Sequence, residues 1–166
     1  MSDFSALTAL YVNTSLKRSA DESHTRLLMQ ASAGIMRKHG VTVDELHMLD
    51  HRVPPGVYPD MTEHGWGQDD WPAIWQRVQA ADILIIGTPL WLGEAGPGPS
   101  YGDGVDGKRA GFDTDFTRRN TTIMTWNAMH LAKMLKIAGG YRTEGNDRRA
   151  FVAGCRFDYE NPEYRA

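Results

Sequence analysis

The sequence predicts an α/β fold in which helices flank a parallel β-sheet. Short apolar runs alternate along the chain with segments whose apolar residues recur at helical spacing. Strands that are joined through helices pair in parallel, and their right-handed crossovers give a doubly wound sheet. Three runs are suitable as strands, so the simplest strand order is 2-1-3.

The first predicted strand covers residues 6–13, an apolar run that is too short for a buried helix and is typical of a central strand. A polar turn follows, and residues 22–39 are then expected to form a helix that ends at Gly40. The apolar residues at helical spacing in this segment are Leu27, Leu28, Ala31 and Ile35.

A more mixed pattern over residues 41–49 predicts an outer strand. Proline and glycine clusters between residues 54 and 67 indicate a surface excursion. The next helix is expected to be capped by Asp69 or Asp70, with Pro72 in its first turn. Its expected buried stripe consists of Ile74, Trp75 and Val78.

Residues 81–87 are apolar at both alternating positions, which is typical of a parallel strand covered by helices on either side. A long Gly/Pro-rich loop is expected over residues 94–120, followed by a helix over residues 121–138. The apolar residues on one face of this helix are Met124, Ala128, Leu131 and Leu135. We expect an irregular tail over residues 141–166 and one domain over residues 1–166.

Composition excludes several classes of protein. The 41% of hydrophobic and 23% of charged residues are ordinary for a globular protein, and a net charge of -3 offers no basic surface for nucleic acid. The single Cys155 can form no intrachain disulfide. With neither a signal-peptide pattern nor an apolar run of about 18 residues, we expect a cytoplasmic protein without membrane contact.

Ligands of such sheets bind beyond the carboxyl ends of the strands, which here points to the loops after the first and third strands. The first loop, residues 13–19, is rich in hydroxyls and cations, and Ser23, His24 and Thr25 lie at the start of the helix that follows. Backbone N–H groups and the helix dipole favour a dianionic phosphate there. The alternative is that Ser23 only caps the helix while Lys17 and Arg18 are solvated.

The second loop, residues 87–93, places Trp91 and two leucines just past a buried strand, where a flat apolar ring could rest. Packing of Trp91 in the core is the competing interpretation. The chain has neither a Walker motif nor a G-x-G-x-x-G fingerprint. Its six histidines show no zinc-ligand spacing, so we expect no metal site.

Together the two loops resemble those of the flavodoxin-like NAD(P)H-dependent FMN reductases, and the likeness extends through residues 119–122 and 154–159. The resemblance implies FMN as cofactor, NAD(P)H as co-substrate and transfer of hydride to the flavin and on to a small-molecule acceptor. It implies phosphate contacts from Ser15, Lys17, Ser23, His24 and Thr25. It implies that the ring is bordered by Pro89, Leu90, Trp91, Leu92 and Gly93. No catalytic side chain is expected, because hydride transfer is the cofactor's own chemistry.

The chain departs from this family after its third strand. The family fold has five parallel strands, but no apolar run suitable for a fourth or fifth follows residue 86. Residues 91–94, Trp-Leu-Gly-Glu, run directly into residues 95–99, Ala-Gly-Pro-Gly-Pro, although relatives have a similar tetrapeptide at two separate places. We therefore expect that an internal segment after Gly93 has been lost and that the sheet is shortened to about three strands.

Loss of this segment would open the flavin site on one side. It would also turn residues 83–86 into an edge strand that pairs with another chain, so we expect a homo-oligomer. The main alternative to an FMN-binding oxidoreductase is a shortened, catalytically silent module that acts by self-association or partner binding. A third possibility is a phosphate-ligand binding protein without redox function.

Overall fold

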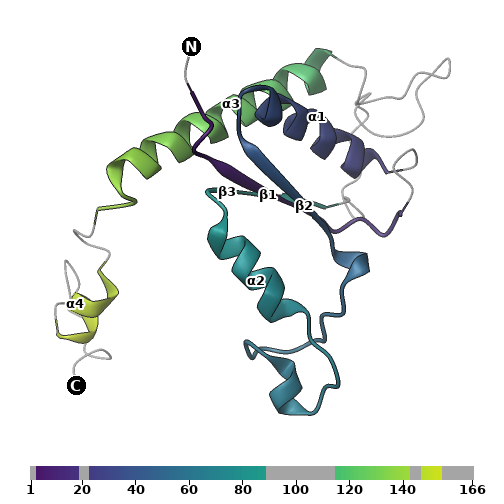
Figure 1. Ribbon diagram of the computed structural model, residues 1–166, viewed down its shortest axis with the longest axis vertical. Coiled ribbons are helices and arrows are strands. Elements are labelled where there is room, and N and C mark those ends of the chain that lie inside the picture. The colour runs from purple at the N-terminus through teal and green to yellow at the C-terminus, as the bar shows by residue number, and fades with distance from the viewer. Residues whose placement is uncertain (1–2, 19–22, 89–114, 143–146, 155–166) are drawn as a thin grey trace. The chain divides into compact units, whose positions relative to one another are not determined.

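The computed structural model describes residues 3–18, 23–88, 115–142 and 147–154. The strands and helices are β1 (Thr8–Asn13), α1 (His24–Lys38), β2 (Thr42–His47), α2 (Trp71–Ala80), β3 (Ile83–Gly87), α3 (Asp115–Ala138) and α4 (Arg148–Val152) (Figure 1). Two short 3-10 helices, Met48–Asp50 and Met61–His64, lie between β2 and α2. The chain divides into two compact units, Met1–Lys133 and Met134–Ala166, and the sheet lies in the first.

The three described strands are parallel, in the order β2-β1-β3, as the sequence predicts. Asn13, the last residue of β1, is in register with His47 of β2 and with Gly87 of β3. The carboxyl ends of all three strands therefore meet at one edge of the sheet.

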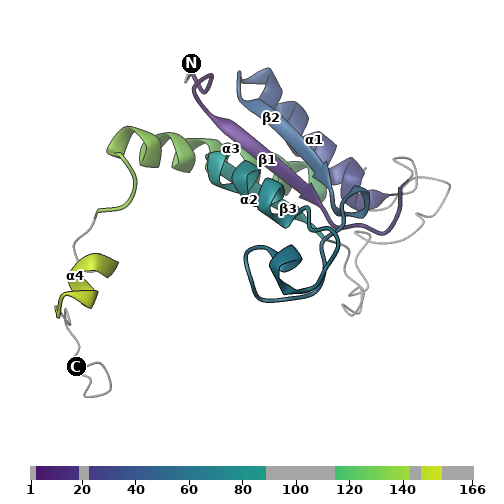
Figure 2. The same ribbon diagram turned by 60° about the horizontal axis from the view of Figure 1, so that its bottom comes forward.

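Helices cover both faces of the central strand. α1 and α3 lie on one face and α2 on the other, as two views of the ribbon agree (Figures 1 and 2). Ala9 and Tyr11 of β1 point into the core beneath α1 and α3, whereas Leu10 and Val12 pack with Ile74 of α2. This alternation of buried residues confirms β1 as the central strand.

The buried stripes of α1 and α3 are displaced from the apolar stripes that the sequence indicates. α1 buries Ser32, Ala33 and Met36, and α3 buries Thr125, Met129 and Ala132. By contrast, Leu28 and Leu131 are 41% and 56% exposed. The buried faces of α1 and α3 are therefore rotated by part of a turn from the expected apolar faces.

A buried chain of hydroxyls explains this displacement. Tyr11 Oη lies 2.8 Å from Ser32 Oγ, which lies 2.7 Å from Thr125 Oγ1. Thr125 also donates to the carbonyl oxygen of Thr121 at 2.7 Å. Burial raises the pKa of the Tyr11 hydroxyl. Because unpaired buried hydroxyls are costly, these bonds determine which sides of α1 and α3 face the sheet.

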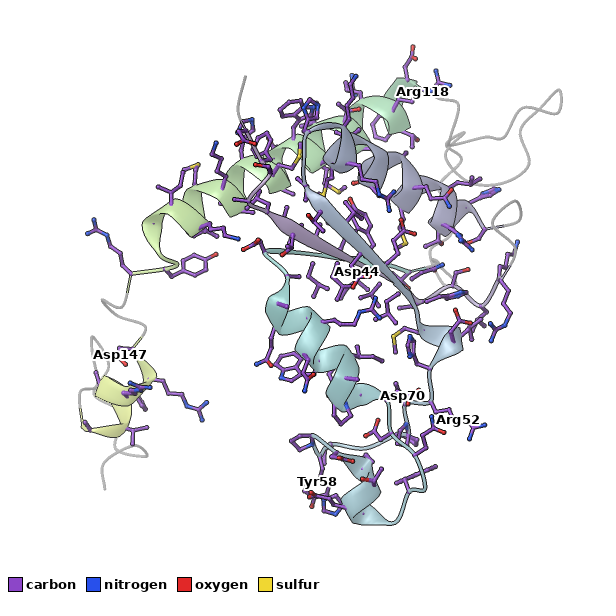
Figure 3. The ribbon with its side chains drawn as sticks, in the orientation of Figure 1. Asp44, Arg52, Tyr58, Asp70, Arg118 and Asp147 are labelled. Atoms are coloured by element: carbon purple, nitrogen blue, oxygen red, sulfur yellow. The ribbon has the colours of Figure 1, made fainter. Side chains whose placement is uncertain are left out.

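Asp69 rather than Asp70 bonds the first backbone amide of α2. Asp69 Oδ1 accepts from the N–H of Trp71 at 2.8 Å, and Asp70, at the cap position, makes no such bond. Asp70 Oδ2 instead accepts from the N–H of Arg52 at 2.8 Å, which fastens the excursion between β2 and α2 (Figure 3). Trp75 is 47% exposed, so only part of the expected α2 stripe is buried.

Element boundaries after β3 also differ from expectation. α3 begins at Asp115, six residues before the predicted start, and α4 lies within the tail expected to be irregular. Both differences fall where the sequence has no clear apolar period to mark an end. The single domain over residues 1–166 stays a prediction. None of the described helices is long and apolar enough to cross a membrane.

Candidate functional site

The loop after β1 is joined to the end of β3. The backbone N–H and the hydroxyl of Thr14 both donate to the carbonyl oxygen of Gly87, at 2.9 and 3.1 Å. A side chain at Gly87 would come within 2.1 Å of Met29 Sδ and 3.1 Å of Thr25 Cγ2. A glycine at this position therefore lets the first turns of α1 pack closely on the carboxyl end of β3.

Two of the predicted phosphate-binding residues meet at the amino end of α1. Ser15 and Ser23 are 4% and 1% exposed, and Ser23 Oγ donates to Ser15 Oγ at 3.2 Å. Ser23 is also the N-cap of α1, because its Oγ accepts from the N–H of Arg26 at 3.2 Å. Ser23 therefore caps the helix, as the alternative interpretation expects, and it also lies beside Ser15.

The O–H of Ser15 donates to none of the residues that the structure describes. Ser15 Oγ accepts from Ser23 and from the N–H of Lys17 at 3.2 Å, but no described residue accepts from its own O–H. A buried donor without an acceptor is costly, and an anion at this position would supply one. Since the helix dipole also favours negative charge here, the residues present fit a phosphate group.

His47, at the end of β2, fixes the backbone of the same loop. Its Nε2 lies 2.7 Å from the carbonyl oxygen of Ser15. A carbonyl oxygen can only accept, so Nε2 carries the proton. In a trans peptide the C=O and N–H point in opposite directions, so the Leu16 N–H points away from His47. No described residue accepts from that N–H, which makes it a second free donor of the loop.

Nothing in the local sequence pattern marks His47 as a site residue. The strand order 2-1-3 contains the necessary signal, because it places the residue that ends β2 beside the residue that ends β1. Nothing in that pattern marks Asn13 either, although its Oδ1 accepts from the N–H of Ser15 at 2.9 Å and so shapes the turn. Both act on the loop backbone, which residue type alone does not reveal.

The other predicted phosphate residues lie at the rim. Lys17 and His24 are exposed, and Thr25 is half-buried in the first turn of α1. Arg18 is not simply solvated, because it pairs with Asp50 and donates from Nη2 to the carbonyl oxygen of Leu49 at 2.7 Å. The predicted ring-contact residues lie outside the described part of the chain; they are Pro89, Leu90, Trp91, Leu92 and Gly93.

Residues 8–97 match the family of NADPH-dependent FMN reductases. The chain belongs to this family. Family membership supports a flavin-related function of the oxidoreductase type and agrees with the parallel sheet and the loop after β1. The matched residues include β1, α1, β2, α2 and β3.

Two further comparisons, one with curated proteins and one with solved structures, also found similar proteins. The chain is 32% identical over 92 residues to the 8-demethyl-8-aminoriboflavin-5'-phosphate synthase of Streptomyces davaonensis, covering 52% of this chain and 36% of that protein. A crystal structure of RosB with a bound 8-demethyl-8-formylriboflavin-5'-phosphate intermediate is 31% identical, with a TM-score of 0.45, covering 52% of this chain and 36% of that one. The divalent metal cation transporter MntH of Mycobacterium bovis is 36% identical over 211 residues, covering 84% of this chain.

The chain spans about a third of the length of its curated relatives: 30% of MntH and 36% of the synthase. The MntH alignment also contains many positions at which this chain has a gap, because 84% of 166 residues cannot fill 211 aligned positions. Within the aligned region the chain is therefore shorter than this relative, in agreement with the expected loss of an internal segment.

Proposed function

We propose that this chain binds FMN through its phosphate at the loop between β1 and α1, and that it passes hydride from NAD(P)H to the flavin and electrons to a small-molecule acceptor. One observation carries the proposal: the buried Ser15 hydroxyl lies at the amino end of α1, and none of the residues that the structure describes accepts its proton. Membership in the FMN reductase family supports a flavin as the source of the anion.

Each residue of the loop has a separate task in this proposal. The Ser15 hydroxyl and the Leu16 N–H donate to phosphate oxygens, while Ser23 orients Ser15. Lys17 adds positive charge at the rim, and His24 and Thr25 bring their side chains to the first turn of α1. The bound FMN would supply the hydride chemistry itself, so no side chain need act as acid or base.

The flavin ring is assigned to the loop after β3, residues 89–93. A tryptophan and two leucines there provide the apolar surface that a flat ring needs. The name of the Streptomyces relative contains a riboflavin 5'-phosphate, the same chemical class as FMN, which supports a phosphorylated flavin as ligand. Metal transport is not carried over from MntH, because the match covers only 30% of that protein.

A second candidate is a catalytically silent flavodoxin-like module that acts by self-association or partner binding. The gapped positions in the MntH alignment favour it, because a chain that lacks an internal segment can also lack part of the ring site. The two candidates make opposite predictions for flavin binding.

A comparison of FMN with riboflavin tests the proposal, because riboflavin has the ring but no phosphate. We expect wild-type protein to bind FMN more tightly, measured by quenching of flavin fluorescence. Ser15→Ala should raise the FMN dissociation constant about tenfold, the effect of one hydrogen bond to a charged group, and leave riboflavin binding unchanged. Thr62→Ala is the matched control, since Thr62 is an exposed hydroxyl residue outside the loop.

Equal affinity for FMN and riboflavin would refute the phosphate assignment. Absence of binding at tens of micromolar FMN by a folded protein would leave the silent module as the better candidate. If FMN binds, bleaching of its absorbance by NADPH or NADH without oxygen tests hydride transfer separately. A bound flavin that neither nucleotide reduces would contradict the reductase activity alone.

A further inference from the structure

β3 forms an unprotected apolar edge of the sheet. Among the described residues it pairs only with β1, and no described strand lies on its outer side. Leu84 and Ile86 are 43% and 61% exposed, and the strand contains neither a charge nor a proline. Exposed edges of this kind pair readily with further strands.

The α2 face of this edge is apolar. Leu84 and Ile86 are in register with Leu10 and Val12, so they lie on the face that packs with α2. One flank of α2 faces the β2 edge, because Arg77 donates to both carboxylate oxygens of Asp44 on β2, at 2.9 and 2.8 Å. Trp75 precedes Arg77 by two residues and therefore lies on the opposite flank of the helix, toward β3.

The other face of the edge is apolar as well. Trp126 of α3 packs against His39 at the end of α1, with ring centroids 4.3 Å apart. Met124 and Leu131 lie on the opposite flank of α3, turned away from α1, and are 47% and 56% exposed. α1 leads into β2, so the flank turned away from it lies toward β3. An apolar layer thus borders β3 on each side of the sheet.

We propose that two copies of this chain pair through their β3 edges, antiparallel and about a two-fold axis perpendicular to the sheet. With the axis at Ile85, Leu84 of one copy lies opposite Ile86 of the other, and Ile83 lies opposite Gly87. Residues an even number of positions apart share a face, so every side chain keeps its side of the sheet. The product is a continuous sheet of twice three strands.

A second copy fits this edge better than an unrelated strand because the surface is complementary to itself. The two-fold axis places the layer with Trp75 against the same layer of the second copy. It likewise places the layer with Met124 and Leu131 against the same layer of the second copy. β3 has no charge to repel its copy. The five exposed side chains offer on the order of 500 Å² per copy, which gives about 1,000 Å² for the pair, near the lower bound of specific interfaces.

Light scattering during size-exclusion chromatography tests the proposal. At tens of micromolar we expect wild-type protein to be a dimer. Ile86→Lys places two charges near the axis and should raise the dimer dissociation constant by roughly 100-fold, so that the monomer predominates. Leu131→Lys should do the same without altering the strand. Val57→Lys is the matched control, since Val57 is 91% exposed in the excursion before α2, and should stay a dimer.

Circular dichroism establishes that each variant is folded. If Ile86→Lys does not fold, the result for Leu131→Lys decides. A wild-type monomer at this concentration overturns the proposal, and so does a dimer that survives both substitutions. An assembly larger than a dimer also overturns it, because a two-fold contact closes at two copies.

Discussion

The two edges of the sheet have opposite chemistry. On β2, Asp44 pairs with Arg77 and Glu45 pairs with Arg37, so charged groups line the outer strand (Figure 3). β3 has no charged residue and exposes two large aliphatic side chains. Charges on an edge discourage pairing with other strands. β2 therefore has the composition of an outer strand, whereas β3 has the composition of an internal strand.

The sharpest measure of this difference compares Leu10 with Leu84. The two are register partners on the same face, yet Leu10 is 1% and Leu84 is 43% exposed. Leu10→Ala should lower the free energy of unfolding by about 2–5 kcal/mol, because it leaves a cavity. Leu84→Ala should cost less than about 1 kcal/mol in the monomer. Urea denaturation of both variants in the Ile86→Lys background measures the two costs; equal values would mean that β3 is covered after all.

The edge strands also hold the loop after β1 in different ways, through the His47 side chain on β2 and the Gly87 carbonyl on β3. His47→Phe keeps the ring but removes the donor to Ser15. We expect FMN affinity to fall several-fold, corresponding to about 1 kcal/mol for one hydrogen bond. His47→Gln restores a donor and should recover part of the loss. Unchanged FMN titrations for His47→Phe would show that the loop needs no support from β2.

Much of this fold was predictable because the strands have strong signals. The apolar run that contains Leu10 and Tyr11 predicted a central strand, and the order β2-β1-β3 followed from helical crossovers. The rotation of α1 and α3 was not predictable, because it depends on hydroxyls 93 positions apart in sequence, Ser32 and Thr125. Apolar periodicity counts such residues as polar and assigns them to the surface.

Removing a charge from the β2 edge should make this edge resemble the β3 edge. Asp44→Val deletes the partner of Arg77 and leaves an apolar side chain on β2. The ion pair is partly exposed, because Asp44 faces solvent while Arg77 is half-buried, so its loss should change the free energy of unfolding by about 1 kcal/mol or less. Association should nevertheless increase beyond the dimer, as measured by light scattering. Glu63→Val, an exposed position outside the sheet, is the control. Equal behaviour of the two variants would show that the charge on β2 does not protect its edge.

The smallest predicted effect is on the stability of the fold at acid pH. Hydrogen bonds from the Gln68 side chain and then from the N–H of Arg52 lower the pKa of Asp70 on the β2 side of the molecule. A lowered pKa in the folded state gives stability that is present at neutral pH and is lost as pH falls below about 4. Asp70→Asn should therefore weaken the pH dependence of unfolding in that range. Gln68→Ala removes the first donor and should weaken the pH dependence of unfolding in the same direction but by less. If the stability of Asp70→Asn falls with pH as steeply as that of the wild type, the role of Asp70 is wrong.

Residue type revealed only part of the site. Ser15 and Ser23 could be proposed from the sequence, since hydroxyl-rich turns before a helix favour phosphate, and their phosphate contacts stay a prediction. The contributions of His47 and Asn13 were not, because each acts on a backbone group whose direction depends on the folded turn. Pro89, Leu90, Trp91, Leu92 and Gly93 remain predictions.

The hydroxyl chain from Tyr11 through Ser32 to Thr125 has a consequence for how this chain can change in length. Its bonds attach α3 directly to α1 and, through Ser32, to β1, so the docking of the helix does not depend on how many residues connect it to β3. The entropy of closing a connection grows only slowly with its length. We therefore expect the fold to tolerate insertions and deletions between β3 and α3, provided that these three hydroxyls are kept.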